Sequence, residues 1–204
     1  MQTLSRRAFA GVALAAATVS AAVAQTVAAG PARLRGTISS LDGNKLTVAT
    51  REGPNVTVTF TEPLTVGALR RVAITDIAPG TSIGAVAEPV ADGTLRAVAI
   101  TVLPPGARIT ERQIPWDLPN TSMNDGPVDA VVESSAGREL TLSINGKSVK
   151  VQVGANTPML MPIPAARADL VPGAAVFINA TRAADGTLSA ARVTVEKDGV
   201  APVI

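Results

Sequence analysis

A seven-residue stretch occurs twice in this chain, and this repetition constrains the fold more than any other feature. Residues 91–97 read Ala-Asp-Gly-Thr-Leu-Arg-Ala, and residues 184–190 repeat them with one substitution, Arg96 against Ser189. An Asp-Gly pair between apolar and β-branched residues is the strongest short-range signal of a β-hairpin, because both central residues of a type I′ turn need positive φ. Two such turns predict two copies of one β domain.

Acidic and turn residues of the two copies keep a constant spacing of 93 positions. They pair as follows: Asp92 and Gly93 with Asp185 and Gly186, and Asp76 with Asp169. Aspartate has a backbone reason to stand in a hairpin turn, and before a Pro-Gly pair it can cap a short helical turn. We therefore interpret the shared acidic residues as structural, and we assign none of them a catalytic role.

Each copy reads as three strands, an irregular segment with a helical turn, and two further strands. Val56, Val58 and Phe60 share one face of an alternating run in the first copy, and residues 149–153 alternate in the second. This element order, over about 70 residues a copy, predicts an all-β protein of two tandem OB-like barrels, each five-stranded and partly open. A small β-sandwich is the alternative.

We expect each copy to close on itself, which sets the domain boundaries. The expected segments are a signal peptide at 1–24, a first barrel at 31–103, a Pro-rich connector at 104–127, a second barrel at 128–198 and a tail at 199–204. Copies of this size are near the lower limit of independent stability, so the two barrels are expected to pack on one another.

Several short motifs resemble a known family. They are Gly-Thr-Ile at 36–38, Asp-Gly-Asn-Lys-Leu-Thr-Val at 42–48, a Pro-Gly pair before a strand, and Ala-Asp-Gly-Thr-Leu at 91–95. With these motifs the chain resembles an uncharacterised family of exported bacterial domains, seen as OB-like barrels singly or in tandem. The second copy departs from the pattern at 130–131 and 135–137. The motif residues belong to turns and strands, so the resemblance implies a fold and brings no catalytic residues.

The first residues predict export. Arg6 and Arg7 precede an apolar run, and Ala-Val-Ala at 22–24 fits a signal-peptidase site. The surroundings of the arginine pair resemble a twin-arginine signal, with general secretion as the alternative. We expect a periplasmic protein, with an extracellular location as the alternative, and no membrane-spanning segment in the mature chain, because the apolar run is short and rich in alanine.

Composition narrows the chemistry. The chain has no cysteine, histidine or tyrosine, which excludes disulfides and thiol catalysis and removes the commonest general base. We predict that the protein is not an enzyme and needs no cofactor. The loss of Arg6 and Arg7 with the leader would reduce 18 basic residues to 16, against 16 acidic ones. This balance speaks against a nucleic-acid partner.

The connector holds the only tryptophan, Trp116. We predict a partner-binding surface made of the connector and the apolar segment 157–164. Its residues are Trp116, Asp117, Leu118, Leu160 and Ile163. The alternative is that Trp116 fills the seam between the barrels. The leading hypothesis is an exported, non-enzymatic binding or structural protein of the bacterial cell envelope that contacts a protein partner here.

Three methionines support a different hypothesis. Met159 and Met161 share a face if extended, Met123 is a third candidate, and thioethers are soft ligands suited to Cu(I). Methionine is also common apolar filler, and the prolines around Met159 and Met161 favour that interpretation. A small-ligand or copper-binding periplasmic protein is therefore the alternative function, and an enzyme of unknown type is the third.

Overall fold

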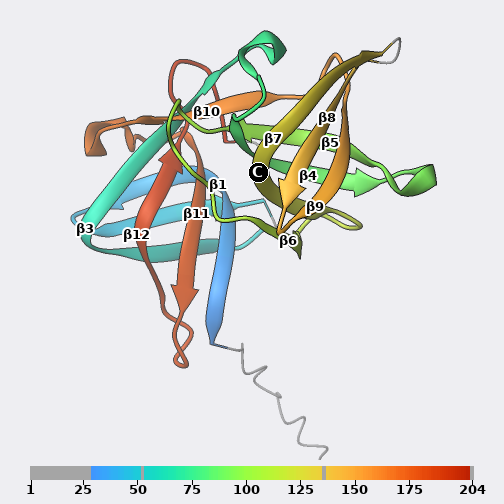
Figure 1. Ribbon diagram of the computed structural model, residues 1–204. Helices are drawn as coiled ribbons and strands as arrows, with labels where there is room; N and C mark the ends of the chain where they lie inside the picture. Colours follow the sequence, from blue (N-terminus) through green and yellow to red (C-terminus); the bar gives the residue numbers. More distant parts are fainter. Residues whose placement is uncertain (1–28, 52, 135–136, 203–204) are drawn as a thin grey trace, which may run out of the picture.

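The computed structural model describes residues 29–51, 53–134 and 137–202, which form an almost entirely β protein (Figure 1). The predicted signal peptide at 1–24 lies outside these residues. No helix within the described ranges has the length and apolar character needed to cross a membrane. The predicted all-β class with small five-stranded barrels is confirmed.

Twelve strands follow one another along the described chain. The first repeat supplies β1 (Gly30–Asp42), β2 (Lys45–Thr50), β3 (Asn55–Arg71), β4 (Ser82–Pro89) and β5 (Leu95–Val102). The connector supplies β6 (Arg112–Pro115). The second repeat supplies β7 (Ser122–Ser134), β8 (Gly137–Ile144), β9 (Lys147–Val153), β10 (Met159–Pro164), β11 (Ala175–Arg182) and β12 (Leu188–Val195). Short 3₁₀ turns lie at Ile74–Asp76, Ala91–Gly93 and Arg167–Asp169.

The two barrels exchange strands between the repeats. Barrel 1 consists of β1, β2 and β3 from the first repeat with β11 and β12 from the second, closed by a parallel pairing of β12 with β3. Barrel 2 consists of β4 and β5 from the first repeat with β7, β8 and β9 from the second, closed by a parallel pairing of β5 with β9. Figure 1 shows barrel 1 on the left, with blue and red strands side by side.

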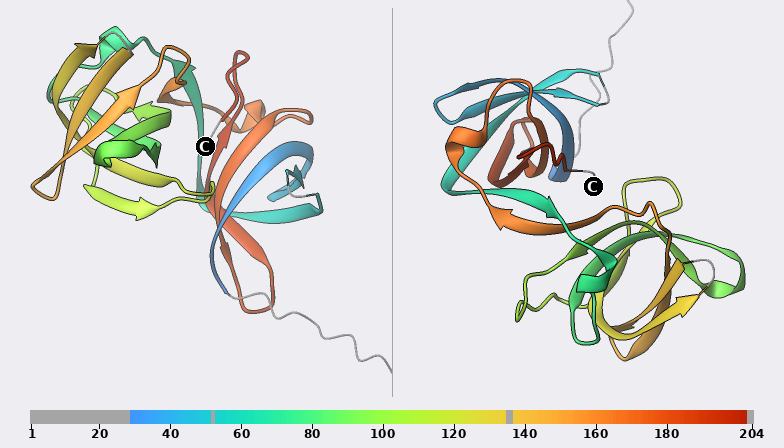
Figure 2. Two further views of the ribbon diagram at one scale, coloured as in Figure 1. Left: turned by 90° about the vertical axis from the view of Figure 1, so that its right-hand side faces the viewer. Right: turned by 90° about the horizontal axis from the view of Figure 1, so that it is seen from above.

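The prediction that residues 31–103 and 128–198 each form a separate barrel is therefore wrong. The first repeat contains the expected five strands, and the second contains their five counterparts and β10 in addition. In neither repeat does the segment between the third and fourth expected strands fold back. In the first repeat β3 continues as an extended strand to Arg71, and in the second β10 occupies most of the apolar segment 157–164. Both extended segments carry the chain from one barrel to the other (Figure 2).

The two crossing segments pair with one another around a local two-fold axis. Leu69 lies opposite Pro162, its own counterpart 93 residues later, at the centre of an antiparallel ladder between β3 and β10. On either side, Arg71 lies opposite Leu160 and Gly67 opposite Pro164, which is the same pair after exchange of the repeats. The molecule thus has the topology of a strand-exchanged dimer whose two halves are joined in one chain.

The cores follow the exchange, because each contains apolar side chains from both repeats. In barrel 1, Leu46 and Val58 pack with Ile178 and Val193. In barrel 2, Ile83 and Ile100 of the first repeat pack in a similar cluster with side chains of the second, Leu140 and Leu142 among them. Alternation along each strand turns these residues inward, and each fully buried side chain of this size contributes about 1.5–3 kcal/mol. Neither core is complete without the other repeat.

The repeated Asp-Gly pairs lie at the ends of two hairpins, β4–β5 and β11–β12. Asp92 and Gly93 both have positive φ, 72° and 80°, as the sequence predicts. In the second copy only Gly186 does, at 85°. There the Gly186 N–H donates to the Ala183 carbonyl at 3.0 Å, which closes a turn before the glycine and leaves Asp185 in an ordinary conformation.

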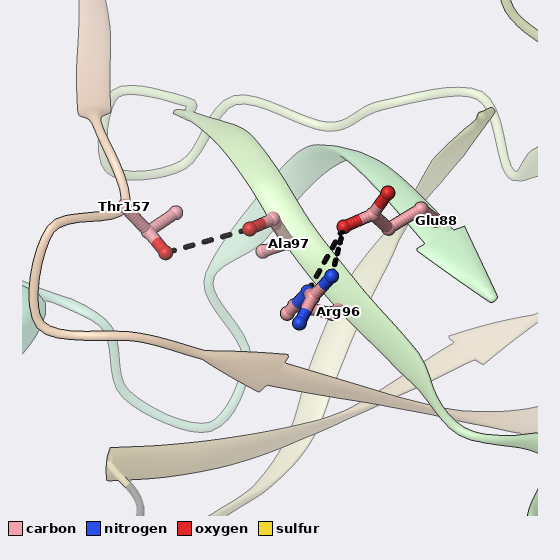
Figure 3. A network of polar contacts seen from close by, with 4 residues as sticks. All are labelled: Glu88, Arg96, Ala97 and Thr157. Atoms are coloured by element: carbon pink, nitrogen blue, oxygen red, sulfur yellow. Dashed lines mark hydrogen bonds and ion pairs between the residues drawn. The ribbon is translucent and has the colours of Figure 1, made fainter. Parts of the chain in front are cut away.

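The one substitution within the repeated motif is matched across the strands. Arg96 on β5 lies opposite Glu88 on β4, and its Nε and Nη2 donate to Glu88 Oε1 at 2.9 and 2.6 Å (Figure 3). In the other hairpin Ser189 lies opposite Thr181, the counterpart of Glu88. The pair has therefore diverged as a unit. Figure 3 also shows Thr157, just before β10, donating to the carbonyl of Ala97 at 3.5 Å.

Candidate functional site

The connector contains a strand of its own, β6, and ends in a β-hairpin whose tip contacts barrel 1. β6 pairs antiparallel with the start of β7, so β7 begins within the segment predicted as connector, 104–127. The Trp116 N–H donates to the Thr121 carbonyl at 2.9 Å and closes the tip of this hairpin. The tip carries Trp116 and Asp117 onto the outer face of β1 and β11.

Trp116 is half-buried at the junction of the barrels. The guanidinium carbon of Arg33, on β1, lies 3.9 Å from the centroid of its ring, within the range of a cation–π contact. The indole N–H is buried and has no hydrogen-bond acceptor among the described atoms. Stacking on Arg33, rather than a hydrogen bond, holds the ring in place.

Asp117 forms an ion pair with Arg35, the next outward-facing residue of β1. Arg35 is only 8% exposed, and its guanidinium carbon lies 4.8 Å from the centroid of the Phe177 ring on β11. Asp117 accepts a hydrogen bond from Arg35 Nη1, while Nη2 is buried without a partner among the described atoms. The arginine side chain thus ties the hairpin tip to barrel 1.

A groove of about 520 Å³ lies between the barrels beside Trp116. Both crossing strands form part of it, through residues 65–69 of β3 and Pro162, Ile163 and Pro164 of β10. Its larger apolar side chains come from four strands and the tip of the β6–β7 hairpin, and include Leu69, Trp116, Met123, Ile163 and Phe177. Threonine hydroxyls, the Asn179 amide and the Arg192 guanidinium add polar groups to the walls. Concave sites of this kind, apolar with a few polar groups, are where proteins bind ligands and peptides.

The structure brings together some of the predicted partner-binding residues. Trp116 and Ile163 both line the groove. Asp117 is not in the lining of the groove but follows Trp116 and accepts a hydrogen bond from Arg35. Leu118 is half-buried outside the lining, and its carbonyl accepts a hydrogen bond from the Thr121 hydroxyl at 2.7 Å. The prediction is wrong for Leu160, which is 2% exposed because alternation along β10 turns it inward while Ile163 faces the groove.

Two further residues line the groove: Phe177, which sequence reasoning missed, and Met123, which it named only as a candidate copper ligand. Phe177 stands between Val176 and Ile178, two buried residues of β11, so it must point out of barrel 1. An aromatic side chain on the outward face of an alternating strand is a signal of a binding surface, and it was available in the sequence.

The three methionines proposed as copper ligands lie in two different surroundings. Met159 and Met161 pack against the core of barrel 2, and the Met161 sulfur accepts a hydrogen bond from Arg70 at 3.0 Å. Met123 lies on β7, where its sulfur is close to Gly84. Within the described ranges, no three His, Cys, Asp or Glu side chains are grouped so that they could hold a metal ion.

Barrel 2 has a counterpart of the Arg35 site, with the charges reversed. Gly36 lies opposite Val176, and Gly126 lies opposite Ile83, the equivalent of Val176, so Arg35 corresponds to Asp125. Asp125 is 2% exposed and pairs with Arg112 of β6. Burial raises the pKa of the Asp125 carboxyl, and the hydrogen bond from Arg112 opposes this shift. A hollow of about 340 Å³ lies beside the pair.

The acidic residues shared by the repeats make local hydrogen bonds in turns. Asp92 and Asp185 each accept from the backbone N–H and hydroxyl of the threonine two residues later, and these bonds lower the pKa of both carboxyls. Asp169 accepts from Lys197 and from the Ala166 N–H, and both bonds lower its pKa. Asp76 accepts from the Ala73 N–H at 3.1 Å, the bond equivalent to that between Asp169 and Ala166. None of the four lines the groove.

Fold and site together define a two-barrel β protein with an apolar groove at the junction. The chain belongs to the family described as domain of unknown function (DUF5666), whose profile matches residues 35–101 and 125–194. The resemblance to an uncharacterised family in tandem is thereby confirmed. Each matched region spans one repeat, and so contributes strands to both barrels. No curated protein and no solved structure matches the chain.

Proposed function

We propose that this protein is a non-enzymatic binding protein that holds an apolar segment of a protein partner in the groove between its barrels. The observation that carries the proposal is the position of Trp116. The single tryptophan of the chain lines the groove together with Phe177 and Ile163, and its ring stacks on the guanidinium of Arg33. Aromatic side chains in such positions dominate the binding energy of protein interfaces.

The chemistry of the groove favours a peptide segment. Apolar side chains offer anchors for a hydrophobic residue, while Thr65, Thr194 and Asn179 offer hydrogen bonds to a peptide backbone. The charged residue of the lining is Arg192, which is exposed. The lining therefore supplies contacts for recognition, and its side chains include no carboxylate, lysine or histidine to act as a general base.

We propose further that the chain is exported and acts in the cell envelope. The support is the sequence of residues 1–24, where Arg6 and Arg7 precede an apolar run and an Ala-Val-Ala site. Expression of the full chain and of an Arg6→Lys/Arg7→Lys variant, followed by cell fractionation, tests the route. If mature protein reaches the periplasm from the full chain but not from the variant, the result supports twin-arginine export. If it reaches the periplasm from both, the result supports general secretion. Cytoplasmic, uncleaved protein in both would contradict export.

The binding proposal is tested with a phage-displayed library of random linear peptides. We expect the purified chain to enrich peptides with an aromatic or large aliphatic residue. Their synthetic versions should change the fluorescence of Trp116, the only indole present. In isothermal titration calorimetry, which does not need the indole, Trp116→Ala and Ile163→Ser should weaken binding by about tenfold or more, since each removes a contact at the centre of the site.

Val132→Ser is the matched control, because this exposed valine lies on β7 outside the lining of the groove. It should leave peptide affinity unchanged. The proposal fails if no peptide is enriched over an unrelated protein. It also fails if the enriched peptides bind the two groove variants as tightly as the wild type.

A further inference from the structure

Part of β1 lacks a neighbouring strand at the position where its counterpart β7 has one. β11 pairs with one side of β1 along its first eight residues, and β2 pairs with the other side only from Gly36 onward. Among the described residues, no strand lies on this second side of residues 30–34. In barrel 2 the equivalent side of β7 is covered by β6.

The backbone groups on this open edge can be identified from the register. The Arg51 N–H donates to the Arg35 carbonyl at 2.9 Å, so the backbone of Arg35 faces away from β11. Alternation then turns the N–H and carbonyl of Arg33 to the same side, where no described strand pairs with them. Met123, the counterpart of Arg33, lies opposite Ile114 of β6. β6 therefore shows how a short antiparallel strand can cover this edge.

The side chains along the open edge are basic. The side chains of Arg33 and Arg35 project from the outer face of β1, over the rings of Trp116 and Phe177 respectively. Arg35 is nine-tenths buried, and its Nη2 has no partner among the described atoms even though Asp117 binds Nη1. In barrel 2 the charges are reversed, because Arg112 of the covering strand lies opposite Asp125 of β7. A strand that complements β1 would carry acidic side chains.

We propose that the open edge of β1, residues 30–34, binds an extended acidic segment of a partner protein, which adds to barrel 1 as β6 adds to barrel 2. Backbone hydrogen bonds to Arg33 would supply affinity, and carboxylates near Arg33 and Arg35 would supply specificity. This surface lies beside the groove and shares with it the contact between Arg33 and Trp116. The proposed strand pairing uses the backbone edge of β1 and does not require the groove to be occupied.

The test uses a short synthetic peptide of alternating Glu and Val, added to the full chain and to the chain beginning at Gln25. Amide hydrogen exchange is measured residue by residue by NMR. We expect the Arg33 amide to exchange freely without peptide and to become at least about tenfold slower with it. The Met123 amide, already covered by β6, should not change. A peptide with Lys in place of Glu, and one N-methylated at alternate amides, should not protect Arg33.

Two substitutions at Arg33 separate the backbone and charge contributions. Arg33→Pro removes the outward N–H together with the charge, and β1 should tolerate it because β11 does not use that N–H. It should reduce peptide affinity by tenfold or more. Arg33→Gln keeps the N–H and loses the charge, so a smaller loss is expected. The backbone contribution is the difference between Arg33→Pro and Arg33→Gln. Ile163→Ser should bind the acidic peptide normally, which distinguishes this proposal from the function proposed for the groove.

Several results would overturn the proposal. If the Lys peptide binds as tightly as the Glu peptide, the acidic specificity is wrong. If the N-methylated peptide binds as tightly, the strand pairing is wrong. Protection of Arg33 in the full chain without peptide, absent from the chain beginning at Gln25, would show that the chain's own first residues occupy the edge. Protection that rises with protein concentration alone would show that a second copy occupies it.

Discussion

The starts of β1 and β7 occupy equivalent places in the two barrels, yet their outer faces have opposite chemistry. Gly36 and Gly126 are both retained, and in each case a Cβ would collide with a carbonyl oxygen, that of Ala49 or Ser143. One residue earlier, Arg35 of barrel 1 stacks on Phe177, whereas Asp125 of barrel 2 lies over Gly84, the counterpart of Phe177.

This comparison separates what the fold requires from what has been free to change. The close approach of two strands admits only glycine, so both copies keep it. The outward positions have diverged together with their neighbours. In barrel 1, Arg35 contacts Phe177 and Asp117. In barrel 2, the equivalent Asp125 contacts Arg112 and lies over Gly84. The groove and the open edge both lie next to the arginine, phenylalanine and aspartate cluster of barrel 1.

The largest effect is expected from cutting the connector, because each barrel is built from strands of both repeats. A protease site inserted among the exposed residues 104–108 should be cleaved without separating the fragments, since each barrel needs both. The loss of the link should cost about 4 kcal/mol at micromolar protein, given an effective concentration near millimolar for joined repeats. The melting temperature should then fall on dilution. Fragments that separate on size exclusion and stay folded would contradict the exchange.

The two glycines should be equally intolerant. Gly36→Ala and Gly126→Ala should each destabilise the protein by about 2–3 kcal/mol in chemical denaturation, because the added methyl group forces two strands apart. Gly67→Ala is the control, since its nearest atom would lie at 3.6 Å, an ordinary contact. If only one of the two glycines is sensitive, the equivalence of the two strand starts is lost.

The two ion pairs should differ in strength. Arg112→Ala leaves the Asp125 carboxylate buried without its partner and should cost about 2 kcal/mol, a value reduced because half of the Arg112 side chain is exposed. Asp117→Ala leaves Arg35 its contact with Phe177 and should cost about 1 kcal/mol. Thermal and urea unfolding give both values. A larger loss for Asp117→Ala would reverse the ranking.

The pH dependence of stability should run in opposite directions at Asp125 and Asp169. Burial raises the folded-state pKa of Asp125, so the folded protein binds this proton more tightly than the unfolded chain does. Wild type should therefore lose stability relative to Asp125→Asn as pH rises from the ordinary carboxyl value through the raised one.

For Asp169, hydrogen bonds lower the folded-state pKa, so wild type should lose stability relative to Asp169→Asn as pH falls through the lowered value. Urea unfolding across the acidic range measures both slopes. Parallel slopes for the two variants would contradict these assignments.

The smallest effect is expected at the hairpins. The double variant Glu88→Thr/Arg96→Ser gives the first hairpin the residues of the second. Because the Glu88–Arg96 pair is exposed, its loss should change the free energy of unfolding by only about 0.2–1 kcal/mol. The single variant Arg96→Ser should behave similarly in the same assay. A change of several kcal/mol in the free energy of unfolding would contradict the interpretation of Glu88 and Arg96 as an exposed surface pair.

Much of the architecture could be predicted from the sequence, because it is local. The repeated Asp-Gly pairs mark two hairpins, and alternation identifies the core residues of each strand. The exchange could not be predicted from strand pairing, since the same interfaces would form within a repeat or between repeats. It depends on whether the segment after Phe60 turns back. Leu64, Val66 and Ala68 alternate there, which was a sign that the strand continues.

Only the locally encoded part of the candidate site could be predicted from the sequence. Trp116 and Ile163 stood out as rare or apolar residues in irregular sequence, and both line the groove. The groove itself is made by the crossing of β3 and β10, so residues such as Thr101 and Thr194 join it only through the exchanged topology. Their proximity has no signature in the local sequence.

The exchange also dictates the order in which a growing chain could fold. Barrel 2 has all of its strands once synthesis passes Val153, although none of them comes from the first third of the chain. The N-terminal strands, made first, must wait for the last one, which ends at Val195. On the ribosome this protein would therefore mature from the middle outward, with its earliest residues the longest without partners.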